Sequence, residues 1–123
     1  MTFKCSTHNE KRATGGCQIC ELTFCKSCLK AYRKILLCEQ HHQLAKKAHW
    51  IPIKTIELSS DRPEEGIRMQ QIKETLWKER GLPAYILTHY RINIERDLIE
   101  SHMQLYVRPE DKDLFKKKIE DQA

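Results

Sequence analysis

Apolar and polar residues alternate most clearly in the second half of the chain. The segment 50–58 is rich in β-branched residues, which is typical of a strand. A helix-start signal follows, because Asp61 precedes Glu64 by three residues and a proline lies between them. Apolar residues then recur at helical spacing until Gly81, which predicts a helix that ends near Arg80. The apolar face of this helix contains Met69, Ile72 and Leu76.

Two more strands and a second helix are predicted downstream. The segments 82–87 and 102–107 have strand patterns, and a helix with acidic residues in its first turn opens near Pro109. The connection Thr88–Ser101 is expected to be partly helical. The predicted order is β-α-β-β-α, which is an α+β domain. One face of the third strand contains Met103, Leu105 and Val107.

Cysteine and histidine dominate the first half. All six cysteines precede residue 40, and with two histidines they form four pairs that share a two-residue gap. This gap lets two side chains meet on one ion, and four pairs supply eight ligands, enough for two tetrahedral Zn2+ ions per chain. A disulfide scaffold, a redox Cys-x-x-Cys site and an iron–sulfur cluster explain the repeated spacing less well. The pairs are Cys5–His8, Cys17–Cys20, Cys25–Cys28 and Cys38–His41.

The spacing leaves two ways to divide the pairs between two ions. Only four residues separate the second pair from the third, with longer gaps on either side, which favours an interleaved arrangement. In that arrangement one ion binds the first and third pairs, and the other ion binds the second and fourth. Sequential pairing also satisfies the spacing. Either way each ion has four protein ligands and no position for a catalytic water, so a protein that is not an enzyme is expected.

The charge is uneven along the chain. Residues 1–49 contain nine Lys or Arg and three Glu, a formal +6, whereas residues 50–123 contain thirteen basic and fourteen acidic residues, a formal −1. We therefore expect two modules, at 1–45 and 50–123. Zinc-bound thiolates would offset part of the basic excess, so a solvated basic face is favoured over a nucleic-acid surface. Four of the basic residues fall at near-helical spacing: Lys26, Lys30, Arg33 and Lys34.

Metal would provide most of the folding free energy of the first module, on the order of 10–16 kcal/mol per structural zinc site. The remaining histidines, His49, His89 and His102, have no partner at metal spacing and are interpreted as ordinary surface or edge residues. A minor apolar core is expected from Phe3, Ile19, Phe24, Leu29, Tyr32 and Leu36.

Apolar runs are short throughout the chain. None approaches the roughly 20 residues that a membrane helix needs, and the first residues have no stretch of signal-peptide type. We therefore expect a cytoplasmic protein with no membrane association.

The first half resembles a known family. Cys5-x2-His8, eight residues, Cys-x2-Cys, four residues, Cys-x2-Cys and a final Cys-x2-His are similar to the B-box-type zinc finger, over about residues 3–45. The resemblance implies a cross-brace with interleaved pairing and a role in protein interaction. The chain departs from the family in the nine residues before its last pair, where the B-box has two histidines soon after the third pair. His41 keeps the two-residue gap and is preferred to His42 as the eighth ligand.

The second half resembles a small prokaryotic domain that is described as signal-transducing. The similarity covers about residues 50–121 and is carried by Gly81–Ile86, by Leu105–Asp111 and by the helices next to them. It implies a ferredoxin-like fold similar to the nitrogen-regulatory PII proteins, with no established reaction. Only fourteen residues separate the second and third predicted strands, so the long nucleotide-binding loop of PII proteins is not expected.

These observations predict a bacterial, non-enzymatic, zinc-binding adaptor that acts in protein–protein interaction or signal transduction. Its partner is a protein whose identity the sequence does not give. One alternative is nucleic-acid binding through the basic finger. A weaker one, by analogy with the B-box and RING, is a ubiquitin-ligase-like module.

A homodimer through the sheet of the second module is also predicted. The strand His102–Val107 has no lysine to repel a second chain, and an unpaired strand edge recruits partners. Trp50 and Tyr106 would extend an apolar surface near that edge. In the alternative, a monomer, the segment Thr88–Ser101 covers the edge.

Overall fold

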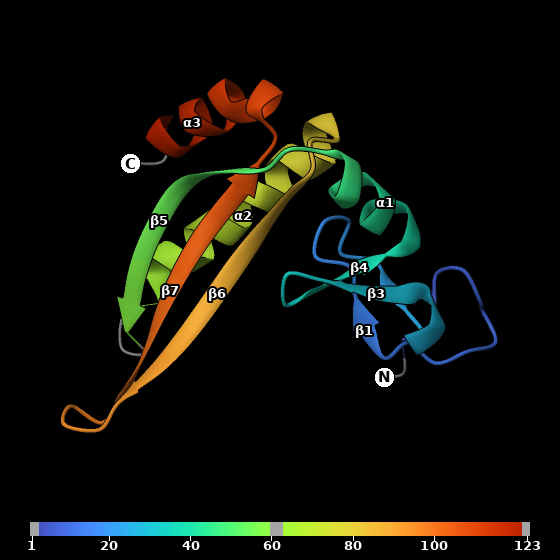
Figure 1. Ribbon diagram of the computed structural model, residues 1–123, viewed down its shortest axis with the longest axis horizontal. Helices are drawn as coiled ribbons and strands as arrows, with labels where there is room; N and C mark the ends of the chain where they lie inside the picture. Colours follow the sequence, from blue (N-terminus) through green and yellow to red (C-terminus); the bar gives the residue numbers. More distant parts are fainter. Residues whose placement is uncertain (1–2, 60–62, 122–123) are drawn as a thin grey trace. The chain divides into compact units, whose positions relative to one another are not determined.

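The computed structural model describes residues 3–59 and 63–121, so the predicted helix-start residue Asp61 lies outside the described part. The chain divides into two compact units, Met1–His49 and Trp50–Ala123. Both units combine helices with small antiparallel sheets, so the protein is α+β (Figure 1). Within the described ranges, no helix has both the length and the apolar character needed to cross a bilayer.

The first unit contains two small sheets and a helix. Its elements are β1 (Gly15–Gly16), β2 (Thr23–Phe24), the 3-10 helix η1 (Lys26–Cys28), β3 (Leu29–Tyr32), β4 (Ile35–Cys38) and α1 (Glu39–Lys47). β1 pairs with β2, and β3 pairs with β4. Arg33 and Lys34 join β3 to β4 with φ angles of 45° and 69°, as a two-residue hairpin turn requires. The four basic residues noted for near-helical spacing therefore lie on η1, β3 and this turn, and not on one helix.

The apolar core of the first unit differs from the expected set. Phe3 and Leu36, both expected in it, are 61% and 44% exposed. Alternate residues of a strand point to opposite sides, so Ile35 and Leu37 of β4 are buried while Leu36 between them points outward. The other expected core residues are buried or partly buried: Ile19, Phe24, Leu29 and Tyr32.

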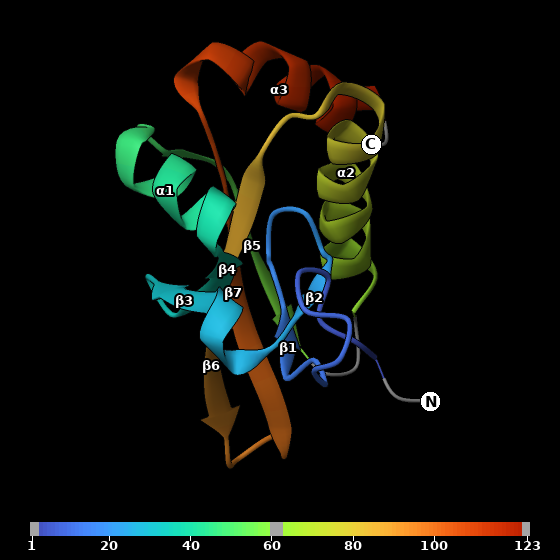
Figure 2. The same ribbon diagram turned by 90° about the vertical axis from the view of Figure 1, so that its right-hand side faces the viewer.

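The second unit is a three-stranded antiparallel sheet with α2 and α3 packed on one face (Figures 1 and 2). Its elements are β5 (Ile51–Ser59), α2 (Glu64–Arg80), β6 (Ala84–Asn93), β7 (Leu98–Val107), the 3-10 helix η2 (Pro109–Asp111) and α3 (Lys112–Asp121). The order β-α-β-β-α is the predicted one. α2 also ends as predicted, because Gly81 has a φ of 65° and its N–H donates to the carbonyl of Trp77 at 2.9 Å.

The expectation of a partly helical Thr88–Ser101 segment is wrong. β6 and β7 continue through it as a hairpin, and their residues pair in register as far as the turn. Arg91 forms an ion pair with Glu100 on the opposite strand, and the Asn93 amide donates to the same carboxylate at 3.0 Å. These cross-strand pairs stabilise the hairpin.

The core of the second unit lies between α2, α3 and the sheet. The predicted apolar faces of α2 and of β7 both point into it. Phe115 of α3 is fully buried in the same core. The buried members of this core are Ile56, Met69, Ile72, Leu76, Ala84, Ile86, Met103, Leu105, Val107 and Phe115.

The prediction that His102–Val107 forms a sheet edge is wrong. The strand order is β5-β7-β6, so β7 is the central strand and is paired on both sides. The segment Thr88–Ser101 does not cover an edge either, since it forms the end of the hairpin.

Tyr106 stacks on Tyr85 of β6 with a centroid separation of 5.0 Å, and the Trp50 ring meets Tyr85 edge-on at 5.0 Å. The unpaired edges belong to β5 and β6.

Candidate metal centre

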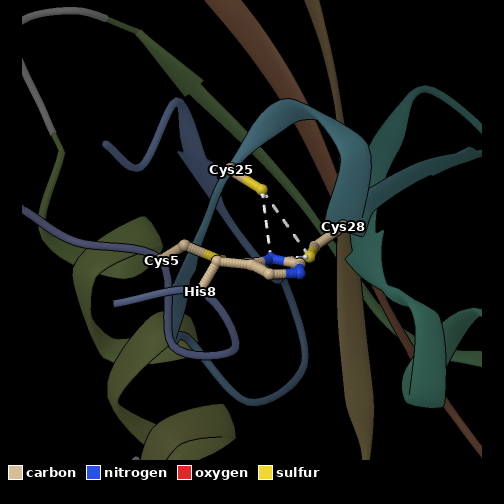
Figure 3. A group of neighbouring side chains, drawn as sticks. All are labelled: Cys5, His8, Cys25 and Cys28. Atoms are coloured by element: carbon tan, nitrogen blue, oxygen red, sulfur yellow. Dashed lines mark hydrogen bonds between the residues drawn. The ribbon is translucent and has the colours of Figure 1, made fainter. Parts of the chain in front are cut away.

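The first and third pairs of predicted ligands meet in the first unit. Cys5 and His8 come from the N-terminal loop, Cys25 immediately precedes η1, and Cys28 is the last residue of η1 (Figure 3). The Cys25 and Cys28 sulfurs are 3.7 Å apart, and the His8 Nδ1 lies 3.3 Å from the Cys28 sulfur. A tetrahedral zinc ion with Zn–S bonds of about 2.3 Å has S···S edges of about 3.8 Å. The spacing of these atoms therefore matches the ligand shell of such an ion.

The second and fourth pairs meet in the same way. Cys17 and Cys20 follow β1, Cys38 ends β4, and His41 lies in the first turn of α1. The His41 Nδ1 is 3.5 Å from the Cys17 sulfur and 3.3 Å from the Cys38 sulfur. His41 is buried, whereas His42 points its ring edge-on to Tyr32 with a centroid separation of 6.5 Å. The geometry thus places His41 in the group and His42 outside it.

The grouping is interleaved in both cases. The ligand atoms of each group lie within 4.8 Å of one another. Each group contains three cysteines and one histidine, and together the two groups use all six cysteines of the chain. The structure therefore has two Cys3His clusters that could each hold a metal ion, and we call them the first and second cysteine clusters.

Tight backbone turns bring together the members of the second and third pairs. In the third pair the Cys28 N–H donates to the Cys25 carbonyl at 3.0 Å. After the second pair the chain reverses at Glu21, whose φ is 63° and whose N–H donates to the Cys17 carbonyl at 2.8 Å. The two-residue gap in the sequence is therefore the gap of a turn that directs both side chains inward.

A hydrogen bond links two thiols of the second cluster, Cys17 and Cys20. The hydrogen bond from the Cys20 thiol lowers the pKa of Cys17 to about 3, and the same bond together with burial raises the pKa of Cys20. In the first cluster burial raises the pKa of Cys5. Hydrogen bonds from three backbone N–H groups have a larger combined effect in the opposite direction, so the pKa is lowered to about 6. Each cluster thus favours at least one thiolate, which is the form that binds a metal ion.

Ser27 is a contributor that the sequence analysis missed. Its hydroxyl lies 3.2 Å from the Cys25 sulfur, and this hydrogen bond is the main reason that the pKa of Cys25 is lowered. Hydrogen bonds of this kind orient metal ligands and tune their charge. A serine inside the Cys-x2-Cys gap is the sequence signal that could have found it.

The ligand sets suit a structural role. Three thiolates and an imidazole are donors that zinc accepts, and a tetrahedral ion bound by all four would have no free coordination position. A cluster of this kind would stabilise the fold of the first unit and would not activate a water molecule.

Comparisons of the chain with protein-family models, with curated proteins and with solved structures find no match.

Proposed function

We propose that the first unit is a two-zinc finger of B-box type and that the whole chain is a non-enzymatic adaptor of the bacterial cytoplasm. The observation that carries the proposal is the interleaving of two complete Cys3His clusters in a segment with few buried apolar residues. Interleaved clusters are the pattern of a cross-brace. Small folds of this kind present a rigid surface, and they need metal because their apolar core is too small.

Metal content tests this proposal directly. Protein purified without added metal should contain two zinc ions per chain when measured by elemental analysis. Thiol-reactive dyes should label none of the cysteines until the protein is denatured or chelated, because all six would be metal-bound. One zinc ion per chain together with reactive thiols in the native protein would contradict the eight-ligand scheme.

The hairpin of the second unit is the proposed interaction surface. Four apolar side chains near its turn are exposed. Single apolar residues are common on protein surfaces, whereas a group of exposed apolar residues marks an interaction site. We name this group the arm patch: Tyr90 (74% exposed), Ile92 (73%), Ile94 (88%) and Ile99 (52%). Ile92 and Ile99 are direct cross-strand partners, so these two members of the patch lie side by side. β6 next to it has an unpaired edge, which is a template for adding a further strand.

We propose that a second copy of the chain pairs with this edge and buries the arm patch. The strand order β5-β7-β6 supports a ferredoxin-like sheet, in which β6 is an edge strand. In a dimer with twofold symmetry, the β6 strands of the two copies would pair and join the two sheets. The predicted homodimer thus uses the sheet of the second module, but through β6 and not through β7.

Sedimentation velocity of the zinc-loaded full chain at micromolar concentration tests the dimer. The expected mass is twice that of one chain, and Ile92→Lys should shift it to that of a monomer because a charge would be buried at the interface. Ile67→Lys is the matched control, since Ile67 is 53% exposed on α2 and outside the arm patch. A monomeric wild-type chain, or a dimer that survives Ile92→Lys, would contradict the proposal.

Nucleic-acid binding is the second candidate. It is favoured by the exposed basic residues Lys30, Arg33 and Lys34, which lie together on the β3–β4 hairpin. Binding through phosphate contacts weakens steeply with salt. Retention of the full chain on DNA or RNA that falls as salt rises, and falls further in Arg33→Gln, would support this candidate over the adaptor.

A further inference from the structure

Three polar residues form a row across the sheet of the second unit. His89 of β6 is directly opposite His102 of β7, and His102 is directly opposite Glu57 of β5. Ile56 and Met103, next to them in sequence, point into the core. Because successive residues of a strand point to opposite sides, Glu57, His89 and His102 share the face opposite α2.

These three side chains are available for a ligand. All three are exposed. The next row along the same face is Ser59, Glu100 and Arg91. There the Glu100 carboxylate is bound by Arg91 and by the Asn93 amide, which neutralises the arginine. Glu57, directly opposite His102, is the carboxylate in the same row as the two histidines.

The chemistry of this row fits a divalent transition metal. Two imidazoles and a carboxylate are a ligand set that binds zinc with its fourth position open. Side chains directly opposite on neighbouring antiparallel strands have Cβ atoms about 4.5–5.5 Å apart. Two imidazoles at that separation can both reach one ion with Zn–N bonds of about 2.0–2.1 Å.

We propose that Glu57, His89 and His102 form a third metal site, which takes one Zn2+ or similar borderline ion per chain. It differs from the cysteine clusters in three ways. It has no thiolate, it has three protein ligands and one open position, and it lies on a sheet surface. In the described residues the only Cys, His or acidic groups of three or more whose ligand atoms lie within 4.8 Å are the two cysteine clusters. Binding at the third site therefore requires the exposed side chains to rotate together, and its affinity should be lower than theirs.

The test uses the full chain with both cysteine clusters loaded with zinc. The protein is titrated with Zn2+ alone in a calorimeter, and bound metal is measured after equilibrium dialysis. The expected result is a third equivalent of lower affinity. His89→Gln and His102→Gln should each weaken it by at least about tenfold, because even the loss of a hydrogen-bond partner of a metal ligand costs about 10–100-fold in affinity. Glu57→Gln should weaken it less, since the amide of glutamine still presents an oxygen ligand at the same position.

His49→Gln is the matched control, because His49 is an exposed histidine that belongs to neither cluster. It should leave the third equivalent unchanged. In NMR spectra Ni2+ should broaden the imidazole signals of His89 and His102 before that of His49. Saturation at two equivalents, a third equivalent that survives both histidine variants, or one extra ion per two chains with a doubled mass would each overturn the proposal.

Discussion

The two units of this protein reach a stable fold by different means. In the described part of Met1–His49, five of the buried side chains are candidate metal ligands and only five others are apolar. In Trp50–Ala123 a sheet and two helices close around ten buried apolar side chains. The first unit should therefore depend on a few strong donor groups, whereas the second depends on many weak packing contacts. The same solution change, or substitutions of similar size, should affect them very differently.

Chelation should separate the units most strongly. Under the proposed two-zinc scheme, a chelator added to the full chain at neutral pH should unfold Met1–His49, because metal binding would supply folding free energy there. The second unit should keep a cooperative thermal transition, and a 50–123 fragment should show the same one. Circular dichroism of chelated and zinc-loaded protein measures this. If both units melt together on chelation, they share a core and the division at residue 50 is wrong.

Loss of one ligand should have the next largest effect. Cys20→Ala should remove one zinc ion and destabilise the first unit by several kcal/mol, since the lost site contributes on the order of 10 kcal/mol. Leu22→Ala, at a 55% exposed position nearby, should leave the metal content at two. Elemental analysis with thermal denaturation reports both quantities. Full metal content in Cys20→Ala would remove that residue from the ligand set.

A core truncation should act on the second unit alone. Leu105 is fully buried on β7, the central strand of the sheet, so Leu105→Ala should lower the free energy of unfolding of this unit by about 2–5 kcal/mol. Zinc content should not change. Ile67→Ala on α2, at a 53% exposed position outside the arm patch, should cost less than about 0.5 kcal/mol. Equal effects of the two changes in urea unfolding would contradict the assignment of the core.

The smallest effect is expected at the Arg91–Glu100 pair. The pKa of Glu100 is lowered by the Asn93 amide and then by Arg91. A carboxyl with a lowered folded-state pKa stabilises the fold above its unfolded pKa of about 4.3, and that stabilisation is lost as pH falls through the lowered value. Arg91→Gln should therefore reduce stability slightly at pH 7 and make no difference at pH 2. A pH series of unfolding curves checks the sign, and a larger difference at pH 2 than at pH 7 would refute it.

Local patterns were sufficient to predict much of this molecule. The two-residue gaps identify the eight residues that the structure gathers, because each gap is a tight turn that acts within four residues. The helix that ends at Gly81 and the inward face of β7 follow from periodicity and from one residue with a left-handed backbone. These signals are short in range, so no knowledge of the rest of the fold is needed to interpret them.

Features that depend on pairing between distant segments could not be predicted in the same way. Whether His102–Val107 lies at the edge or the centre of the sheet depends on where β5 docks, and the sequence does not encode this locally. The long hairpin was missed because its stability comes from cross-strand pairs such as Arg91–Glu100. For the same reason His89 and His102 appeared unrelated, although the register of β6 and β7 places them side by side.

The alternation of ligand pairs makes the first unit tolerant of a broken chain. A cut between Glu21 and Leu22 leaves two pairs on each piece, and each cluster then takes one pair from either side of the cut. Metal ions would therefore fasten the two pieces together, and β1 and β2, which lie on opposite sides of the cut, could still pair. Sequential clusters would instead give two independent fragments. Peptides 1–21 and 22–49 mixed with zinc should thus form one complex, and a chelator should dissociate that complex into the two peptides.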